Sequence, residues 1–195
     1  MTSVSALNHI HKTGLFGNHE NKNEESLLKV SEINNLLIVQ IVQYKNSTVS
    51  FENIDIDSLK LKNEPQIVVS NNNTRILWNG PKNWLLVSTK KDLLKNIIEV
   101  FKETDFAVTD LSHSRAIIEL EGQDAKEVLK KGCPFNFNTL DKNNSINSTY
   151  NGIAFTVDML DNNPDKIRLF VLRSFGESLY HSITDASLEF GFKSL

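Results

Sequence analysis

The stretch from Asp110 to Phe137 constrains the fold of this chain more than any other segment. Residues 114–121 alternate between apolar and other side chains, which predicts a strand with one buried face. That face carries three apolar side chains: Ala116, Ile118 and Leu120. Gly122 then turns the chain. Such a strand requires a sheet whose face is covered by other elements.

A short helix is predicted directly after this turn. Asp124 is placed to cap it, and three apolar residues at helical spacing face inward: Ala125, Val128 and Leu129. Gly132 follows two lysines, where a left-handed stop and positive charge both suit a helix end. Pro134 prevents the helix from continuing. We therefore expect this helix to pack on the sheet that contains the strand.

Hydrophobic periodicity predicts the other elements. Strands are expected at Leu36–Tyr44, Gln66–Ser70, Thr74–Trp78, Trp84–Ser88, Ile153–Met159 and Ile167–Val171, the second with the third and the fifth with the sixth as hairpins. Helices are expected at Asp92–Thr104 and from Phe175 to about Phe190. The first of these helices carries one apolar stripe of five residues: Leu93, Leu94, Ile97, Ile98 and Phe101. The fold class is therefore α+β, a mainly antiparallel sheet with helices packed on it.

The 195 residues are organised, we expect, as a flexible N-terminal arm and one domain. Residues 1–25 are polar and glycine-containing, which is typical of an arm. Residues 26–195 are predicted to form a single α+β domain with two lobes.

Several partners and locations are excluded by composition. The net charge is −3 and there is no long basic run, so nucleic acid is not an expected partner. The longest apolar run, Leu36–Val42, is too short to span a bilayer, and the N-terminus does not resemble a secretory signal. Cys133 is the single cysteine, which excludes an internal disulfide and favours a reducing compartment, so we expect a cytoplasmic protein without membrane association.

Asp110, Ser112 and His113 carry the side chains of a hydrolase triad. Neighbouring strand residues point to opposite faces, so Ser112 and His113 would not meet, and no Gly-x-Ser-x-Gly turn occurs. We expect instead a turn in which Asp110 and Ser112 bond local backbone amides.

Other reactive residue types lack the context that their chemistry requires. His9, His11 and His19 lie in the predicted arm, whereas zinc needs ligands held rigidly. Cys133 follows a helix C-terminus, where the helix dipole disfavours a thiolate. Gly14–Gly17 matches neither a phosphate loop nor a dinucleotide fingerprint. We expect no catalytic, cofactor-binding or metal-binding residues in this chain.

Two tryptophans and two arginines stand out as candidates for structural or interface roles. Trp78 and Trp84 flank a Gly-Pro turn, where aromatic residues serve equally as interface anchors or as core residues. Arg115 and Arg173 lie beside strand ends among apolar residues, which suits a carboxylate clamp. The alternative for these arginines is an internal ion pair, with Asp110 or Glu177 as the acid.

Four short patterns occur in order between residues 74 and 195. The first reads Leu-Trp-x-Gly-Pro-x-x-Trp-Leu from Leu77, and the second reads Asp-x-Ser-His-x-Arg from Asp110. The third reads Gly-x-Asp-Ala-x-x-Val-Leu-x-x-Gly-Cys-Pro from Gly122, and the fourth begins Arg-Ser-Phe at Arg173. Together they resemble the gamma subunits of heterotetrameric sarcosine oxidase. The family's Leu-Asp-Leu after Cys-Pro is here 135–137, Phe-Asn-Phe, which replaces a carboxylate with an amide.

The resemblance implies a fold similar to the folate-binding domain of glycine-cleavage T-proteins. It also implies a complex of alpha, beta, gamma and delta subunits that demethylates sarcosine to glycine, passes the one-carbon unit to tetrahydrofolate and makes hydrogen peroxide. FAD, FMN, NAD and zinc would belong to the partner subunits, and this chain would be the non-catalytic subunit. Its interface or structural residues would be Trp78, Trp84, Arg115, Phe135, Arg173 and Phe175, with Asp110 and His113 as remnants of a folate pocket.

Two alternatives belong to other functional classes. A free-standing folate-binding protein of the aminomethyltransferase type would bind folate alone, through Asp110, His113 and Arg115, although this chain is roughly half the length of such enzymes. An iron–sulfur assembly factor of the folate-domain kind is similar at Lys131–Cys133. The Tyr-x-Gly-Gln-Glu that should follow is replaced by Pro134–Asn136.

Overall fold

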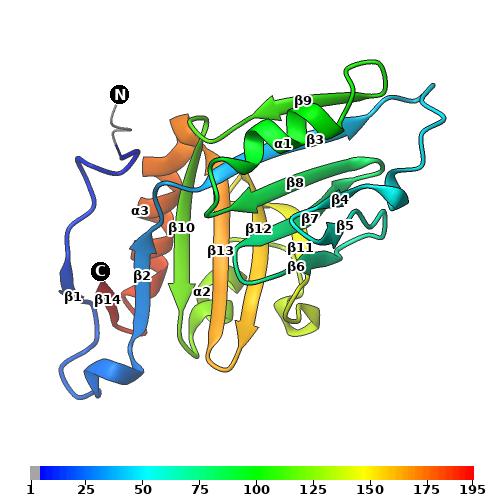
Figure 1. Cartoon of the computed structure of the whole chain (residues 1–195). Helices are drawn as coiled ribbons and strands as arrows, with labels where there is room; N and C mark the ends of the chain where they lie inside the picture. The colour runs from blue at the N-terminus through cyan, green and yellow to red at the C-terminus, as the bar shows by residue number, and fades with distance from the viewer. Residues whose placement is uncertain (1–4) are drawn as a thin grey trace. The chain divides into compact units, whose positions relative to one another are not determined.

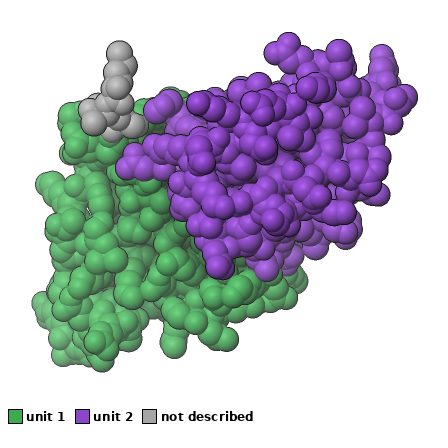
Figure 2. Space-filling view, viewed as in Figure 1, with its two compact units in different colours: residues 1–34, 114–142, 146–195 green, residues 35–113, 143–145 purple. Residues whose placement is uncertain are grey.

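The computed structural model describes residues 5–195, which form two compact units (Figures 1 and 2). Unit 1 contains the residues up to Asn34, then 114–142 and 146–195. Unit 2 contains Asn35–His113 together with Asn143–Ser145. Each unit has its own sheet and its own apolar core.

The sheet of unit 1 has seven strands in the order β1-β14-β2-β10-β13-β12-β11. Their bounds are Gly14–Phe16 (β1), Leu28–Glu32 (β2), Arg115–Glu121 (β10), Ser145–Tyr150 (β11), Ile153–Asn162 (β12), Asp165–Leu172 (β13) and Phe192–Ser194 (β14). β14 runs parallel to β2, whereas β10 pairs antiparallel with both β2 and β13. The predicted second hairpin is confirmed as β12 and β13 (Figure 1), whose strands extend so far that Asn163 and Pro164 alone connect them.

Helices α2 (Ala125–Lys130) and α3 (Gly176–Ser187) cover one face of this sheet. The predicted inward residues of the strand and of α2 are buried in one cluster, which also contains Leu179 and Ile183 of α3. Three short 3-10 segments complete unit 1: Glu24–Ser26, Phe137–Thr139 and Arg173–Phe175 (η1, η3 and η4). The expectation that Asp124 caps α2 is wrong, since its side chain makes no capping hydrogen bond.

The segment predicted as an arm contributes to unit 1. Its residues 1–4 lie outside the described residues. Leu7 is fully buried in the core, and β1 pairs with β14 along the edge of the sheet. Leu7 and β1 thus pack on unit 1, whereas most other residues between 5 and 25 are exposed. The flexibility of the segment, and the behaviour of residues 26–195 as a single domain, stay predictions.

Unit 2 is built on a five-stranded antiparallel sheet in the order β6-β7-β8-β3-β9. The bounds are Leu37–Gln43 (β3), Val68–Ser70 (β6), Thr74–Gly80 (β7), Asn83–Ser88 (β8) and Phe106–Asp110 (β9). A two-stranded ribbon, Asp55–Ile56 (β4) with Leu59–Lys60 (β5), and a 3-10 turn, Phe51–Asn53 (η2), complete it with helix α1, Leu93–Val100. The four strands predicted before residue 90 are confirmed, whereas the sequence did not predict β4, β5 or β9.

Helix α1 is shorter than predicted, and its apolar stripe is narrower. Ile97 and Phe101 are buried among side chains of the sheet, but Ile98 is 54% exposed. Ile98 lies about 100° around the helix from Ile97, so it turns away from the flat surface that Ile97 faces. The prediction that Ile98 belongs to the buried stripe was wrong.

The predicted fold class is confirmed: the sheets are mostly antiparallel and helices pack on them.

Candidate functional site

The triad-like residues of unit 2 form a local turn. Asp110 ends β9, and its Oδ1 accepts hydrogen bonds from the Ser112 amide at 2.9 Å and the Ser112 hydroxyl at 2.6 Å. The Ser112 Oγ in turn accepts a hydrogen bond from the Ile38 amide at 3.0 Å, which joins the end of β9 to β3. His113 is exposed. The predicted turn is confirmed for Asp110, which accepts from the local Ser112 amide, but not for Ser112, whose Oγ accepts from the distant Ile38 amide. A folate-pocket role for Asp110 and His113 stays a prediction.

The two tryptophans differ in environment. Trp84 in β8 is fully buried, its Nε1 donates to the Lys62 carbonyl at 2.7 Å, and its ring lies 5.0 Å from that of Phe51. Trp78 in β7 is only partly buried, and its Nε1 donates to Asn63 Oδ1 at 3.3 Å. Of the two roles left open by the sequence, Trp84 takes the core role. Trp78 keeps an accessible surface.

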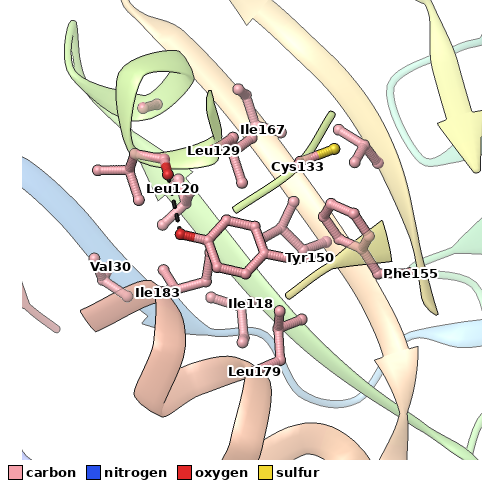
Figure 3. Packing of buried hydrophobic residues seen from close by; sticks show 14 of the residues in the cluster. Val30, Ile118, Leu120, Leu129, Cys133, Tyr150, Phe155, Ile167, Leu179 and Ile183 are labelled. Atoms are coloured by element: carbon pink, nitrogen blue, oxygen red, sulfur yellow. Dashed lines mark hydrogen bonds between the residues drawn. The ribbon is translucent and has the colours of Figure 1, made fainter. Parts of the chain in front are cut away.

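Cys133 of the Gly-Cys-Pro motif lies with Tyr150 in the core of unit 1 (Figure 3). The Tyr150 hydroxyl donates to the Val128 carbonyl at 3.1 Å, and burial is the main cause that raises the pKa of Tyr150 to about 12. A Cβ added to Gly132 would lie 2.6 Å from the Tyr150 ring. Gly132 does not have a positive φ, so the predicted left-handed stop is wrong. Glycine stands here because the tyrosine ring approaches the backbone.

Cys133 and Phe135 also serve this core. The Cys133 thiol is buried and donates to Ser148 Oγ at 3.2 Å, as expected for a packed thiol. Phe135 is partly buried and packs edge-on against Phe137, with ring centroids 5.4 Å apart. The third motif of the sequence is therefore explained by packing.

Charged side chains form cross-strand rows on the sheet face of unit 1 that points away from α2 and α3. Glu121 lies opposite Lys166 at 2.8 Å, and Glu119 lies opposite Arg168 at 2.7 Å. Lys29 of β2 adds a further contact to Glu121 at 3.0 Å. Hydrogen bonds from Lys166 and Lys29 lower the pKa of Glu121, and the bond to Glu121 raises the pKa of Lys166. Each charge in these rows is thus neutralised by a neighbouring strand.

Arg115 stands at the end of the same face and has different partners. Its guanidinium is partly buried and donates to the Ser114 carbonyl at 3.3 Å and the Ser114 hydroxyl at 3.1 Å. Within residues 5–195 it makes no ion pair, so the internal ion pair considered for it is not formed. Burial lowers the pKa of Arg115. Arg173, at the start of η4, is partly buried, and Phe175 is 47% exposed.

The histidines of the N-terminal segment do not gather. His9 is exposed, His11 packs edge-on against Tyr180 with ring centroids 5.5 Å apart, and His19 Nδ1 lies 2.8 Å from the Gly17 carbonyl oxygen. Over residues 5–195, no three His, Cys, Asp or Glu side chains are placed to hold a metal ion.

A pocket of about 200 Å³ lies between the N-terminal segment and α3. Its lining consists of Ile10, Lys12, Phe16, Tyr180, His181, Thr184, Asp185, Leu188 and Phe192. The apolar members outnumber the charged ones, so the pocket can hold a small apolar group. Sequence reasoning missed it because residues 10–16 were assigned to a mobile arm. None of the helices in the described range is long and apolar enough to cross a bilayer.

Comparison with known sequences identifies two relatives of one kind, although no family model matches the chain. The chain is 29% identical over 120 residues to the sarcosine oxidase gamma subunit of Corynebacterium sp. strain U-96, covering 60% of this chain and 58% of that subunit. It is 34% identical over 62 residues to the gamma subunit of strain P-1, covering 31% and 30% of the two chains. The matched part is thus less than two thirds of either relative.

Comparison with solved structures covers nearly the whole chain. A chain of heterotetrameric sarcosine oxidase from Corynebacterium sp. U-96, solved in complex with pyrrole 2-carboxylate, matches with a TM-score of 0.78 and 22% identity, covering 96% of this chain and 95% of that one. The glycine cleavage aminomethyltransferase T of Bartonella henselae matches with a TM-score of 0.61 and 12% identity, covering 87% of this chain and 48% of that protein. The predicted likeness to the T-protein fold is confirmed. The chain is thus similar in sequence to the sarcosine oxidase gamma subunit and similar in fold to a chain of heterotetrameric sarcosine oxidase.

Proposed function

We propose that this chain is the gamma subunit of a heterotetrameric sarcosine oxidase and supports that complex without catalytic residues of its own. One observation carries the proposal: a fold match over 96% of the chain to sarcosine oxidase coincides with gamma-subunit sequence similarity over 60% of it. In this proposal the complex is cytoplasmic and oxidatively demethylates sarcosine to glycine, with tetrahydrofolate as one-carbon acceptor and O₂ as oxidant. The alpha, beta and delta subunits carry FAD, FMN, NAD and zinc.

The environments of the reactive side chains support a structural role. Ser112 and Asp110 bond each other, Ser112 Oγ also accepts from the Ile38 amide, and Cys133 is enclosed in the core. Of the six residues predicted for interface or structural roles, Trp84 and Phe135 belong to the cores. We assign the interface role to the four that belong to neither core: Trp78, Arg115, Arg173 and Phe175.

Co-expression tests this function. An affinity tag on this chain should recover the alpha, beta and delta subunits with it, and the recovered complex should show flavin absorbance and consume O₂ when sarcosine is added. The chain expressed alone should be colourless and inactive. Flavin binding or turnover by the lone chain would contradict the structural role. A fully active complex of the other three subunits, from which this chain is excluded, would contradict the assignment itself.

A second candidate is a free-standing folate-binding protein of the aminomethyltransferase type. The match to aminomethyltransferase T favours it, although this chain spans only 48% of that protein. Calorimetric titration of the isolated chain with tetrahydrofolate separates the two. The gamma-subunit proposal predicts no binding heat. Binding that is lost on Asp110→Ala or His113→Ala would favour this second candidate.

A further inference from the structure

The register of β10 against β13 pairs four rows of side chains on the sheet face away from α2 and α3. Glu121 lies opposite Lys166, Glu119 opposite Arg168, and Ile117 opposite Phe170. The first two rows are ion pairs. In the third row both side chains are apolar and buried. Each of these rows matches charge with charge or apolar with apolar, as cross-strand pairs normally do.

The fourth row breaks this rule, because Arg115 lies opposite Leu172. Three other cations of this face, Lys29, Lys166 and Arg168, each meet a carboxylate within 3.0 Å. Arg115 is partly buried but bonds only Ser114 among the described residues. A guanidinium that loses part of its hydration without an anion raises the free energy of the folded chain. Leu172 is also in an unfavourable environment, since this apolar side chain is 45% exposed to solvent.

We propose that Arg115 and Leu172 form a docking spot for a neighbouring protein subunit that presents a carboxylate beside an apolar side chain. This inference rests on the proposed function, which supplies the neighbouring subunits. The partner's carboxylate takes the place that Glu119 and Glu121 occupy in the other rows, and its apolar side chain covers Leu172.

Charge complementarity selects this occupant. The planar guanidinium presents paired N–H donors that match a carboxylate. A free anion would neutralise Arg115 but would leave Leu172 in water, whereas a protein segment matches both residues. The backbone at this end of the sheet is already paired, because the Arg173 amide donates to the Ser114 carbonyl at 2.9 Å. Recognition therefore depends on the two side chains. Arginine and buried apolar residues are typical of interface centres.

Two variants test the inference: one removes the positive charge of Arg115, and the other supplies it with an internal carboxylate. Arg115→Gln removes the charge and should weaken binding of the chain to the purified partner subunits by about tenfold or more, with a smaller salt dependence than wild type. Leu172→Glu places a carboxylate opposite Arg115, so the row becomes an internal ion pair. It should weaken binding by a similar factor without lowering the melting temperature of the isolated chain. Loss of binding with an intact fold separates docking from folding.

Lys95→Gln is the matched control, because it removes one positive charge from an exposed position on α1. Its dissociation constant should equal that of wild type. If wild type binds the partner subunits and both test variants bind equally well, the inference is wrong while the proposed function stands. If wild type binds none of the subunits, both fail. Stabilisation of the isolated wild type by sodium phosphate, lost in Arg115→Gln, would assign Arg115 to a free anion and would also overturn the docking spot.

Discussion

Gly132 shows how a side chain distant in sequence, here Tyr150, can require glycine at a position. Its backbone lies so close to the Tyr150 ring that an added Cβ would stand 2.6 Å from two ring atoms. The nearby Asn151 amide donates to the Gly132 carbonyl at 2.9 Å, which holds the two segments together. The glycine is thus required by packing of unit 1.

Gly132→Ala should therefore destabilise the chain by about 1–3 kcal/mol, the usual cost of overpacking a core. Urea unfolding measures this loss. In a Tyr150→Val background, the same substitution should cost clearly less, because the smaller side chain leaves room for the methyl group. Strictly additive effects of the two substitutions would show that the ring contact is not the cause.

The raised pKa of Tyr150 predicts that the folded chain loses stability at alkaline pH. Its pKa is raised from the ordinary value of 10.0 to about 12, mainly by burial. Its contribution is therefore fully present below pH 10 and is lost as the pH rises through about 12. A difference of this size corresponds to about 3 kcal/mol. Urea unfolding of wild type and Tyr150→Phe between pH 8 and about 12 should show wild type losing more stability.

The exposed Tyr44 provides the control for this experiment. It is 43% exposed, so Tyr44→Phe should lose stability in parallel with wild type across the alkaline range. A Tyr150→Phe variant that also follows wild type would mean that the tyrosine hydroxyl titrates freely in the folded chain.

At the scale of elements, the ion-pair rows join β2, β10 and β13 across the face of the sheet that the helices leave uncovered. Hydrogen bonds from Lys166 and Lys29 lower the pKa of Glu121 below its ordinary 4.5. The stability that Glu121 contributes is therefore present above pH 4.5 and is lost as the pH falls through the lower folded-state pKa. Its side chain is 27% exposed, so solvent screens the pair.

Glu121→Gln should accordingly cost about 0.5–1 kcal/mol at pH 7, and the difference from wild type should vanish in acid, below the folded-state pKa. Thermal unfolding at several pH values between 2 and about 7 measures it. Glu127→Gln is the control, because Glu127 pairs with Lys130 on the exposed surface of α2 and its removal should change little. A Glu121→Gln deficit that is independent of pH would indicate lost packing instead of a lost charge.

At the scale of the whole molecule, unit 1 is assembled from three separate stretches of chain. The first stretch supplies Leu7, β1 and β2, and the last supplies β14, which lies between β1 and β2. Removing residues 1–25 would uncover β14 and leave a cavity where Leu7 packs. We expect the truncated chain to lose stability by several kcal/mol, about 2–5 from Leu7 alone. A thermal melt unchanged by the truncation would support the flexible arm instead.

Arg173→Ala tests the proposed role of the molecule in its complex. If Arg173 contacts a partner subunit, the variant should reduce the yield of co-purified complex, while the turnover of sarcosine per assembled complex stays equal to wild type. Lys95→Ala, at an exposed position on α1, should change neither quantity. Normal assembly with reduced turnover would place Arg173 in the chemistry.

Much of the fold is encoded in contiguous residues. The alternation in Ile153–Asn162 and Asp165–Leu172 predicted the β12–β13 hairpin, and the three asparagines after Ser70 predicted the turn between β6 and β7. Asp110 was predicted to bond a local backbone amide, as the structure confirms, whereas Ser112 Oγ accepts instead from the distant Ile38 amide. The confirmed features are local, because strand periodicity and side-chain turns involve residues only a few positions apart.

The sequence by itself thus determined the main strands and helices, the α+β class and the likeness to gamma subunits. Only the tertiary structure decided why Gly132 is glycine, that Ile98 faces solvent, that Leu7 and β1 belong to unit 1, and that Arg115 lies opposite Leu172 and not opposite an acid. The physical reason is the range of the interactions. Propensity and turn chemistry act between neighbours in the chain, whereas close packing, cross-strand register and charge pairing depend on residues that meet only after the chain has folded.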